Sequence, residues 1–449
     1  MARLFGTDGI RGVANNEPMT AETALAIGRA TAHVCRRHKN RHRVVIGKDT
    51  RVSGYMLETA LTAGICSMGV DVLLVGPMPT PGIAFITHSM RADAGMVISA
   101  SHNPYQDNGI KIFSRDGFKI PDEIEDEIES LVTTGRIKDI RPTAEAIGKA
   151  FRIEDAIGRY IVFCKNTFPD SLTLDGLRIA IDCANGATYK VAPVIFSELG
   201  AEVIPMNDHP NGMNINDRCG ALHPEALAAR VVETGAHIGL AFDGDGDRLI
   251  AVDETGRTLT GDHVMAVCAR RMKSLGLLRN DLVICTPMSN FGFRQALAAM
   301  NIRHEDAGVG DRYVLRMMRE KGAALGGEES GHIIFLNHHT TGDGIISALQ
   351  LLAAIRESGR KLSELAAIMT RAPQKLINIE VARKPPIGEL PDLKAETEKA
   401  EAELSGRGRV LIRYSGTQML CRVMVEGPDE DTTNRIALRL ADAVKRSIG

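Results

Sequence analysis

Short runs of apolar residues, each followed by a segment with helical periodicity, recur through most of the chain. The runs at 44–46, 72–75 and 96–98 end at glycine or polar residues, and similar runs stand at 238–242 and 282–285. A strand that is apolar along its whole length has to be covered on both faces. Alternation of such strands with helices therefore predicts an α/β fold with mainly parallel, mixed sheets between layers of helices.

The order of strand, polar turn and helix is repeated from near residues 43, 178 and 281, which predicts three similar α/β domains. The pattern is interrupted at 384–405, where Lys-Pro-Pro precedes a stretch rich in Glu, Lys and Ala. Beyond this stretch, apolar and polar residues alternate as in half-buried antiparallel strands, before a final helix. We expect a smaller C-terminal α+β domain from about residue 371 onward.

The composition is that of a folded protein with several apolar cores, since 44% of the 449 residues are hydrophobic and 24% are charged. The formal net charge is −2, and only 4% of the residues are aromatic, with no Trp. Nearly balanced charge and few rings for base stacking predict no nucleic-acid partner. The basic run at 36–43 is interpreted as the solvated end of a helix that begins after Thr20.

The eight cysteines form no C-x-x-C pair. They indicate buried free thiols in a reducing compartment rather than a zinc site or a disulfide framework. The first residues lack the apolar core of a signal peptide, and no run reaches the ~18 apolar residues of a membrane span. We therefore expect a cytoplasmic protein with no membrane partner.

The acidic loop is the most informative motif: Asp243, Asp245 and Asp247 alternate with glycines directly after an apolar run. On a tight turn these carboxylates would repel one another without a cation, and their hard oxygens indicate Mg²⁺ or Ca²⁺ rather than zinc. An EF-hand is the first alternative, with Glu254 at position twelve. It is disfavoured because Arg248 stands at position six, where that loop needs Gly, and because both flanks are strand-like.

A second polar loop, 99–104, follows the apolar run at 96–98. It lies at the carboxyl end of a predicted strand, where open α/β sheets bind their ligands. Ser101 beside His102, with Lys111 nearby, is a candidate nucleophile with basic helpers, although a polar turn explains the loop alone equally well. The absence of G-x-S-x-G, of a complete P-loop and of G-x-G-x-x-G argues against α/β-hydrolase, nucleotide-hydrolysing and dinucleotide-binding functions.

Three further glycine-rich loops carry groups that suit sugars or phosphates. The loop 326–332 offers acceptors and donors for sugar hydroxyls. The loop 413–417 combines a guanidinium, two hydroxyls and a glycine, which together suit a phosphate. The loop 4–12 places Arg11 among glycines. Each loop alone is a weak signal, because glycine-rich turns are common.

In their order along the whole chain, five motifs resemble those of the α-D-phosphohexomutase superfamily. They are F-G-T-D-G-I-R-G from residue 5, S-A-S-H-N-P from 99, D-G-D-G-D-R from 243, G-E-E-S-G-H from 327 and R-Y-S-G-T from 413. The opening motif resembles the branch of the superfamily that acts on glucosamine phosphates. The resemblance implies four domains around a central cleft, which we place at 1–150, 151–255, 256–370 and 371–449.

The resemblance also implies a role for each motif. The metal ligands would be the phosphate on Ser101 together with Asp243, Asp245 and Asp247, holding one Mg²⁺ per chain. The groups around the transferring phosphoryl group would be Arg11, His102, Lys111 and Arg248, with Lys111 and His102 as candidates for proton transfer. The remaining substrate-binding residues, for sugar hydroxyls or the phosphate that is not reacting, would be Glu328, Ser330, His332, Arg413, Ser415, Gly416, Thr417 and Arg422.

The implied reaction moves a phosphoryl group between two positions of one phosphosugar. The phosphoserine would donate to glucosamine 6-phosphate, the glucosamine 1,6-bisphosphate would turn round, and its other phosphate would return to Ser101. A homodimer is also expected from the resemblance. A phosphatase-like hydrolase, which would release phosphate without isomerisation, is an alternative.

Two loops depart from the family pattern. Gly308 stands where the family usually has Lys, and Gln418 and Met419 stand where it usually has Glu-Pro. The absence of this lysine charge near the substrate should weaken phosphate binding. Two further alternatives therefore stay open: a phosphoglucomutase or phosphomannomutase of the same superfamily, or a sugar-phosphate-binding relative with weak activity.

Overall fold

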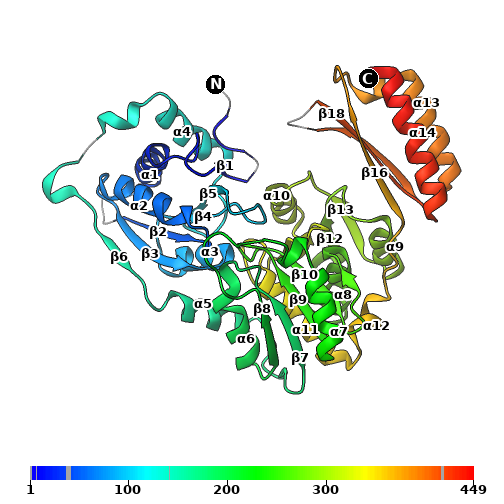
Figure 1. Cartoon of the computed structure of the whole chain (residues 1–449), viewed down its shortest axis with the longest axis horizontal. Helices are drawn as coiled ribbons and strands as arrows, with labels where there is room; N and C mark the ends of the chain where they lie inside the picture. The colour runs from blue at the N-terminus through cyan, green and yellow to red at the C-terminus, as the bar shows by residue number, and fades with distance from the viewer. Residues whose placement is uncertain (1–2, 7, 37–41, 141, 416–418) are drawn as a thin grey trace. The chain divides into compact units, whose positions relative to one another are not determined.

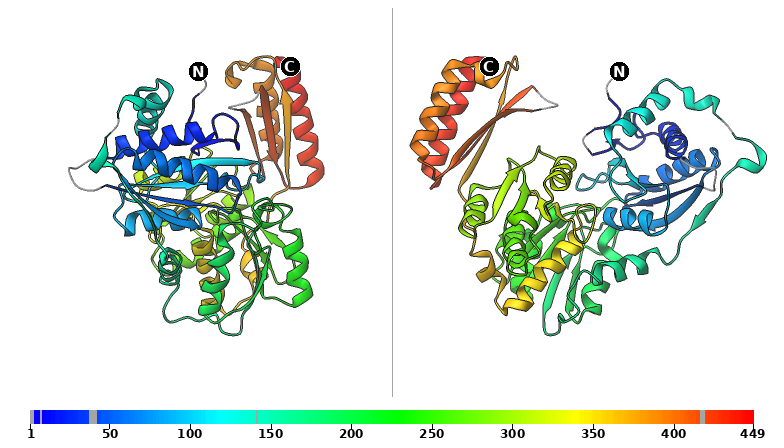
Figure 2. Two further views of the ribbon diagram at one scale, coloured as in Figure 1. Left: turned by 60° about the vertical axis from the view of Figure 1, so that its left-hand side comes forward. Right: turned by 180° about the vertical axis from the view of Figure 1, so that it is seen from behind.

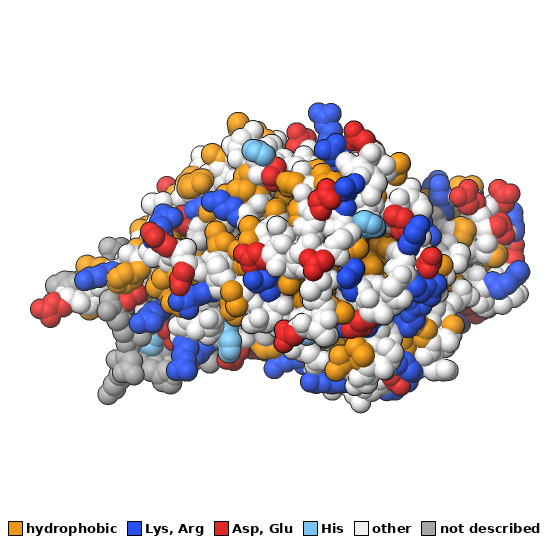
Figure 3. Space-filling model, turned by 90° about the horizontal axis from the view of Figure 1, so that it is seen from below, with side chains coloured by type: hydrophobic (Ala, Val, Ile, Leu, Met, Phe, Trp, Pro, Cys, Tyr) orange, Lys and Arg blue, Asp and Glu red, His pale blue; other side chains and the backbone are white. Residues whose placement is uncertain are grey.

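The computed structural model describes residues 3–6, 8–36, 42–140, 142–415 and 419–449. The chain forms two compact units, residues 1–286 with 305–367, and residues 287–304 with 368–449 (Figure 1). Charged side chains of both signs are interspersed over the face drawn in Figure 3, in keeping with the nearly balanced charge. Within the described ranges, no helix is both long and apolar enough to cross a membrane.

A six-stranded mixed sheet organises the N-terminal part of the first unit, in the order β1-β5-β4-β2-β3-β6. Its strands are β1 (Ile10–Val13), β2 (Arg43–Lys48), β3 (Asp71–Pro77), β4 (Ala94–Ile98), β5 (Asp107–Ser114) and β6 (Ala150–Arg152). β2 pairs in parallel with β3 and β4, and β3 pairs in parallel with β6. β5 is antiparallel to both β4 and β1.

Helices cover both faces of this sheet because its central strands are apolar on both faces (Figure 1). Val44 and Ile46 of β2 share one core with α1 (Ala21–Cys35), α2 (Ser53–Cys66) and α4 (Asp122–Thr133). On the other side, Gly47 faces Ile83 of α3 (Thr80–Ser89). As predicted, Thr20 caps α1, and its side chain accepts a hydrogen bond from the N–H of Thr23.

Two smaller mixed sheets follow. The second has the order β11-β10-β9-β7-β8, with β7 (Arg178–Asp182), β8 (Glu202–Met206), β9 (Ile238–Phe242), β10 (Leu249–Asp253) and β11 (Thr258–Leu259). The third has the order β13-β12-β14-β15, with β12 (Leu282–Cys285), β13 (Arg303–Asp306), β14 (Leu325–Gly327) and β15 (Ile333–Phe335). The helices of this part of the chain are α5 (Ala156–Lys165), α6 (Ala192–Glu198), α7 (Glu225–Thr234), α8 (Gly261–Ser274), α10 (Asp311–Lys321), α11 (Gly344–Ser358) and α12 (Leu362–Ala366).

The second unit contains an antiparallel sheet in the order β16-β18-β17. Its strands are β16 (Gln374–Glu380), β17 (Arg409–Tyr414) and β18 (Leu420–Glu426). Helices α13 (Pro391–Leu404) and α14 (Glu430–Ile448) cover one face of the sheet and share its apolar core (Figure 2). The segment with α9 (Phe291–Ala299) joins this unit, where the Glu426 carboxylate accepts hydrogen bonds from the Asn290 side chain and the Phe291 N–H.

The predicted fold class is confirmed: three α/β sheets with helices precede a smaller antiparallel α+β part. The acidic loop lies between strands β9 and β10 rather than between helices, and Glu254 bonds to Ser363 instead of turning toward the loop, which rules out an EF-hand. Helix α13 occupies much of 384–405, which the sequence pattern showed only as an interruption. Residues 37–41 of the basic run lie outside the described residues.

Gly28 of α1 and Gly64 of α2 allow these helices to cross closely, and this contact gives a stability prediction. A Cβ on Gly64 would lie 2.3 Å from the carbonyl oxygen of Leu25. We expect Gly64→Ala to lower the free energy of unfolding by about 1–3 kcal/mol, because the helices must move apart. The control is Gly158→Ala in α5, where a Cβ would meet no atom within 4 Å. Urea denaturation should show a neutral or stabilising control, and equal stabilities for the two variants would contradict the prediction.

Candidate active site

Several of the predicted site residues lie on loops at the carboxyl ends of strands of the first unit. Ser101 follows β4, the acidic loop 243–247 follows β9, and the loop 328–332 follows β14. Lys111 lies on β5 and Arg11 on β1, the strand that pairs with β5. Parallel strands place their carboxyl ends at one edge of a sheet, so each sheet presents its polar loop in the same way.

The carboxylates of Asp243, Asp245 and Asp247 converge, and one oxygen of each lies within 4.8 Å of the other two. All three residues are buried, with at most 6% exposed. Oδ1 of Asp245 and Oδ1 of Asp247 are buried without a hydrogen-bond partner in the described part of the chain. Burying a carboxylate oxygen without a partner costs free energy, so this arrangement fits a hard divalent cation that takes oxygen ligands.

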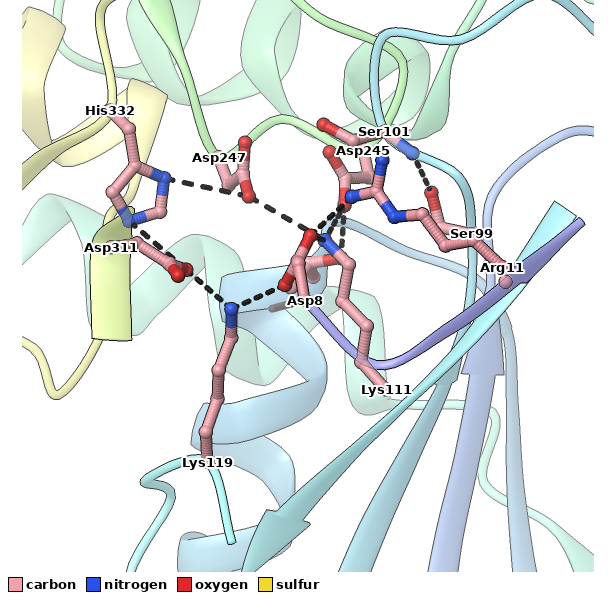
Figure 4. Close-up of polar contacts among 12 residues, drawn as sticks. Asp8, Arg11, Ser99, Ser101, Lys111, Lys119, Asp245, Asp247, Asp311 and His332 are labelled. Atoms are coloured by element: carbon pink, nitrogen blue, oxygen red, sulfur yellow. Dashed lines mark hydrogen bonds and ion pairs between the residues drawn. The ribbon is translucent and has the colours of Figure 1, made fainter. Parts of the chain in front are cut away.

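Lys111 supplies the nearest fixed positive charge (Figure 4). Its Nζ lies 3.0 Å from Oδ2 of Asp245, 3.7 Å from Oδ2 of Asp247 and 3.2 Å from Oδ2 of Asp8. The Lys111 side chain is 2% exposed. Burial alone would lower its pKa, but Asp245 and Asp8 outweigh burial and raise that pKa above its ordinary value. Lys111 is therefore protonated and positively charged near pH 7.

A chain of alternating charges continues from Asp8 (Figure 4). Asp8 forms an ion pair with Lys119, and Lys119 pairs in turn with Asp311 at the start of α10. His332 connects this series of charges back to the acidic loop. Its Nε2 lies 3.8 Å from Oδ2 of Asp311, and its Nδ1 lies 3.5 Å from Oδ2 of Asp247. Each buried charge thus faces an opposite charge, which offsets the cost of removing it from water.

The environment separates the pKa values of the clustered groups. Burial, and then the charges of Asp247 and Asp245, raise the pKa of Asp243 well above its ordinary value. Burial would also raise the pKa of Asp247, but Lys111 and His332 outweigh it and hold that pKa below its ordinary value. Burial would lower the pKa of His332, whereas the Asp247 charge raises it to about 9. A proton on Asp243 and a divalent cation are therefore alternative ways to neutralise the same carboxylates.

Ser101 links its own loop to the acidic loop. Its Oγ donates a hydrogen bond of 2.6 Å to Oδ2 of Asp243, and the residue is 2% exposed. Its backbone has φ +52°, in the left-handed region. That conformation costs a residue with a side chain about 1–3 kcal/mol and persists only where neighbouring contacts hold it. One such contact is the hydrogen bond of 2.9 Å from the Ser101 N–H to the Ser99 hydroxyl.

A cavity of about 520 Å³ lies beside Ser101. The predicted residues that line it together with Ser101 are Arg11, His102, Asp247, Arg248, Glu328 and His332. Ser330 is exposed in the same turn as Glu328 and does not line this cavity. The volume suits a small polar ligand such as a hexose phosphate. The structure therefore brings together most of the residues that the sequence motifs singled out in the first unit.

The remaining predicted residues belong to the second unit. Arg413 of β17 stands directly opposite Arg422 of β18. Burial, and then the neighbouring Arg422 charge, lower the pKa of Arg413. Two guanidinium groups side by side favour an anion between them. Ser415 is buried just after β17, whereas Gly416, Thr417 and Gln418 lie outside the described residues.

Sequence reasoning missed three charged residues of this site. Asp8 stands inside the recognised N-terminal motif, so its position between glycines was an available signal. Lys119 and Asp311 are far apart in the chain and belong to no shared local pattern, and only the packing of the first unit makes them neighbours. At Gly308, which departs from the family pattern, the neighbouring group is the ring of Tyr313. A Cβ on Gly308 would lie 3.1 Å from that ring.

Comparison with protein families matches four models to consecutive parts of the chain. Three are described as phosphoglucomutase/phosphomannomutase alpha/beta/alpha domains I, II and III, and the fourth as the C-terminal domain of the same family. They match residues 2–138, 158–256, 260–372 and 376–443, respectively.

Similar curated proteins cover the whole chain. A phosphoglucosamine mutase of Syntrophobacter fumaroxidans is 59% identical over 449 residues, and one of Syntrophus aciditrophicus is 57% identical over 449 residues, each match covering 100% of both chains. Among solved structures, a phosphoglucomutase/phosphomannomutase family protein of Burkholderia thailandensis has TM-score 0.83 at 25% identity, covering 99% of this chain and 97% of that one. The N-acetylphosphoglucosamine mutase of Aspergillus fumigatus, with TM-score 0.67 and 17% identity over 99% of this chain and 96% of that one, shares the fold.

The charge of Lys111 gives a second prediction. We expect Lys111→Met to lower the free energy of unfolding by about 3–5 kcal/mol without added divalent cation, because it leaves buried carboxylates uncompensated. Added Mg²⁺ should restore part of the loss. The control, Lys165→Met, removes an ion pair with Glu198 whose side chains are 28% and 47% exposed, and should cost less than about 1 kcal/mol. Similar losses in the two variants by chemical denaturation would contradict the prediction.

Proposed function

Because the chain belongs to the phosphoglucomutase/phosphomannomutase family, we propose that it interconverts glucosamine 6-phosphate and glucosamine 1-phosphate through a phosphoserine. The family predicted from the five ordered motifs is thereby confirmed. The full-length similarity to phosphoglucosamine mutases supports glucosamine as the sugar. The chain is accordingly an isomerase that acts by intramolecular phosphoryl transfer.

One observation carries the proposal: the Ser101 hydroxyl donates to Asp243, one of three converging buried carboxylates, and Ser101 lines a cavity of hexose-phosphate size. A phosphate on Ser101 adds about −1.5 to −2 charges at pH 7. Beside three carboxylates, that charge needs a cation. Oδ1 of Asp245 and Oδ1 of Asp247, which have no hydrogen-bond partner in the described residues, are available to bind that cation.

Magnesium fits this donor set, and its ligands would be the Ser101 phosphate with Asp243, Asp245 and Asp247. When bound, Mg²⁺ would offset the charge that develops as the phosphoryl group leaves the serine oxygen. Arg11 and Arg248, which line the cavity, are placed to bind the other phosphoryl oxygens.

In this proposal His102 accepts a proton and Lys111 donates one. Burial, and then the charges of Arg248 and Arg11, lower the pKa of His102 to about 4, so its imidazole is neutral near pH 7. A neutral imidazole can accept the proton of the attacking sugar hydroxyl. Lys111 is protonated near pH 7 and can give a proton to the Ser101 oxygen when the phosphoryl group departs, which leaves a neutral amine that can take a proton from Ser101 in the second half-reaction. The reverse half-reaction, from glucosamine 1,6-bisphosphate, uses the same groups in opposite order.

The substrate contacts follow from the same assignment. Glu328 and His332 would bind sugar hydroxyls, and Ser330 in the same turn would join them. Arg413, Arg422 and Ser415, with Gly416 and Thr417, would bind the phosphate that is not reacting. The homodimer, the cytoplasmic location and the four-domain division at 1–150, 151–255, 256–370 and 371–449 stay predictions, of which light scattering tests the first.

A coupled assay with glucosamine 6-phosphate, Mg²⁺ and a trace of glucosamine 1,6-bisphosphate tests the proposed reaction. We expect turnover by the wild-type protein, and less than about one thousandth of it in Ser101→Ala, which removes the phosphoryl carrier. The surface variant Ser358→Ala should keep full activity. Turnover of glucose or mannose phosphates without glucosamine 6-phosphate would contradict the sugar assignment, and phosphate release without isomerisation would indicate a hydrolase.

Metal binding gives a separate prediction that needs no activity. Mg²⁺ at 100-fold excess over its Kd should stabilise the wild-type protein by about 2.7 kcal/mol, seen as a higher midpoint of thermal unfolding. Asp245→Asn should lose most of this response, whereas Asp217→Asn, an exposed carboxylate of the same sheet domain, should keep it. Apparent affinity should fall as the pH is lowered, because a proton on Asp243 competes with the cation. An equal response in both variants would rule out the acidic loop as the site.

A further inference from the structure

Two carbonyl oxygens of the phosphoserine loop, those of Ser101 and Asn103, are each held by two side chains. Arg51 donates from the segment after β2, with its Nη2 3.2 Å from Ser101 O and also bonded to Asn103 O. Asn216 donates through Nδ2 to the same two oxygens, each at 2.9 Å. A side-chain amide has two N–H groups on one nitrogen, so both carbonyls can receive one hydrogen at once.

Asn216 approaches this loop from a segment of the second sheet domain that is itself fixed. Its N–H donates a 2.9 Å hydrogen bond to the carbonyl oxygen of Ala184, and the preceding Ile215 is 1% exposed. The same segment meets the first sheet domain at another point, where the Val52 N–H donates to Gly212 O at 2.9 Å. Asn216 is thus anchored at its backbone while its side chain holds the serine loop.

The acidic loop packs directly against the hydrogen bond between Asn216 and the Ser101 carbonyl. A Cβ on Gly244 would lie 2.7 Å from Nδ2 of Asn216 and 2.7 Å from the carbonyl oxygen of Ser101. Only glycine allows the acidic loop to come this close. The Asn216 amide, the Ser101 carbonyl and Gly244 therefore form one packed contact. A shift of the Ser101 backbone would change the distance between its side chain and the neighbouring Asp243.

We propose that Asn216 is a positioning residue for phosphoryl transfer, which holds the left-handed backbone of Ser101 and sets the serine against the acidic loop. The inference rests on the proposed mutase function. Arg51 holds the two carbonyls from the sheet domain that carries Ser101, whereas Asn216 holds them from the sheet domain that carries the three aspartates. Asn216 does not line the cavity beside Ser101, and it acts through the serine backbone rather than on the substrate.

The test compares Asn216→Ala and Asn216→Asp with Asn214→Ala at saturating Mg²⁺. Asn214 lies in the same segment, and its side chain bonds to Asn211 and His209. We expect kcat for glucosamine 6-phosphate to fall about tenfold to 100-fold in Asn216→Ala, with KM changed less than about threefold. Asn216→Asp should fall at least as far, since a carboxylate keeps the shape but cannot donate to two carbonyls. Asn214→Ala should keep the wild-type kcat.

Amide hydrogen exchange of the peptide 99–104 gives a readout that is independent of activity. Exchange should be faster in both Asn216 variants and unchanged in Asn214→Ala. Wild-type kcat and exchange in Asn216→Ala would overturn the inference, as would faster exchange throughout the chain, which would indicate a general structural role. An inactive wild-type protein would refute the proposed function, while the exchange experiment would still decide whether Asn216 holds the loop.

Discussion

Repulsion among three buried carboxylates is the constraint on which the rest of the site depends. Asp243, Asp245 and Asp247 are buried and lie too close together to remain charged without compensation. The structure meets this constraint with the buried Lys111 ammonium and with a raised pKa at Asp243. A phosphate on the adjacent serine would increase the negative charge further. The close approach of the carboxylates, which helps to raise the pKa of Asp243, therefore also creates the need for a divalent cation during phosphoryl transfer.

Compensation of charge also explains why the site draws residues from three sheets. Lys111 belongs to the first sheet, the aspartates follow a strand of the second, and His332 comes from the loop after β14 of the third. Lys119 and Asp311 extend the alternation with an ion pair between the first and third sheet domains. Movement of one domain would therefore leave buried charges unpaired, which couples the geometry of the site to the packing of the whole first unit.

Much of the fold and the centre of the site could be predicted from the sequence, because both are encoded locally. Continuous apolar runs specify buried strands. The loop after one such run carries Ser101, and the loop after another carries the three aspartates at alternate positions, so each motif is visible in a short stretch of sequence. Lys119, Asp311 and Asn216 could not be predicted, since each acts on residues more than a hundred positions away. Helix α13 was recognisable in principle, because Glu, Lys and Ala are good helix formers, but the preceding prolines obscured it.

The central claim is that the phosphate on Ser101 and the three aspartates bind one divalent cation together. Phosphorus NMR of the protein phosphorylated at Ser101, titrated with paramagnetic Mn²⁺, tests it most directly. The account predicts that the phosphoserine resonance broadens beyond detection at one equivalent of Mn²⁺, and that excess Mg²⁺ restores it. A resonance that stays sharp when Mn²⁺ is bound to the protein would contradict the claim, because the cation would then lie away from the phosphate.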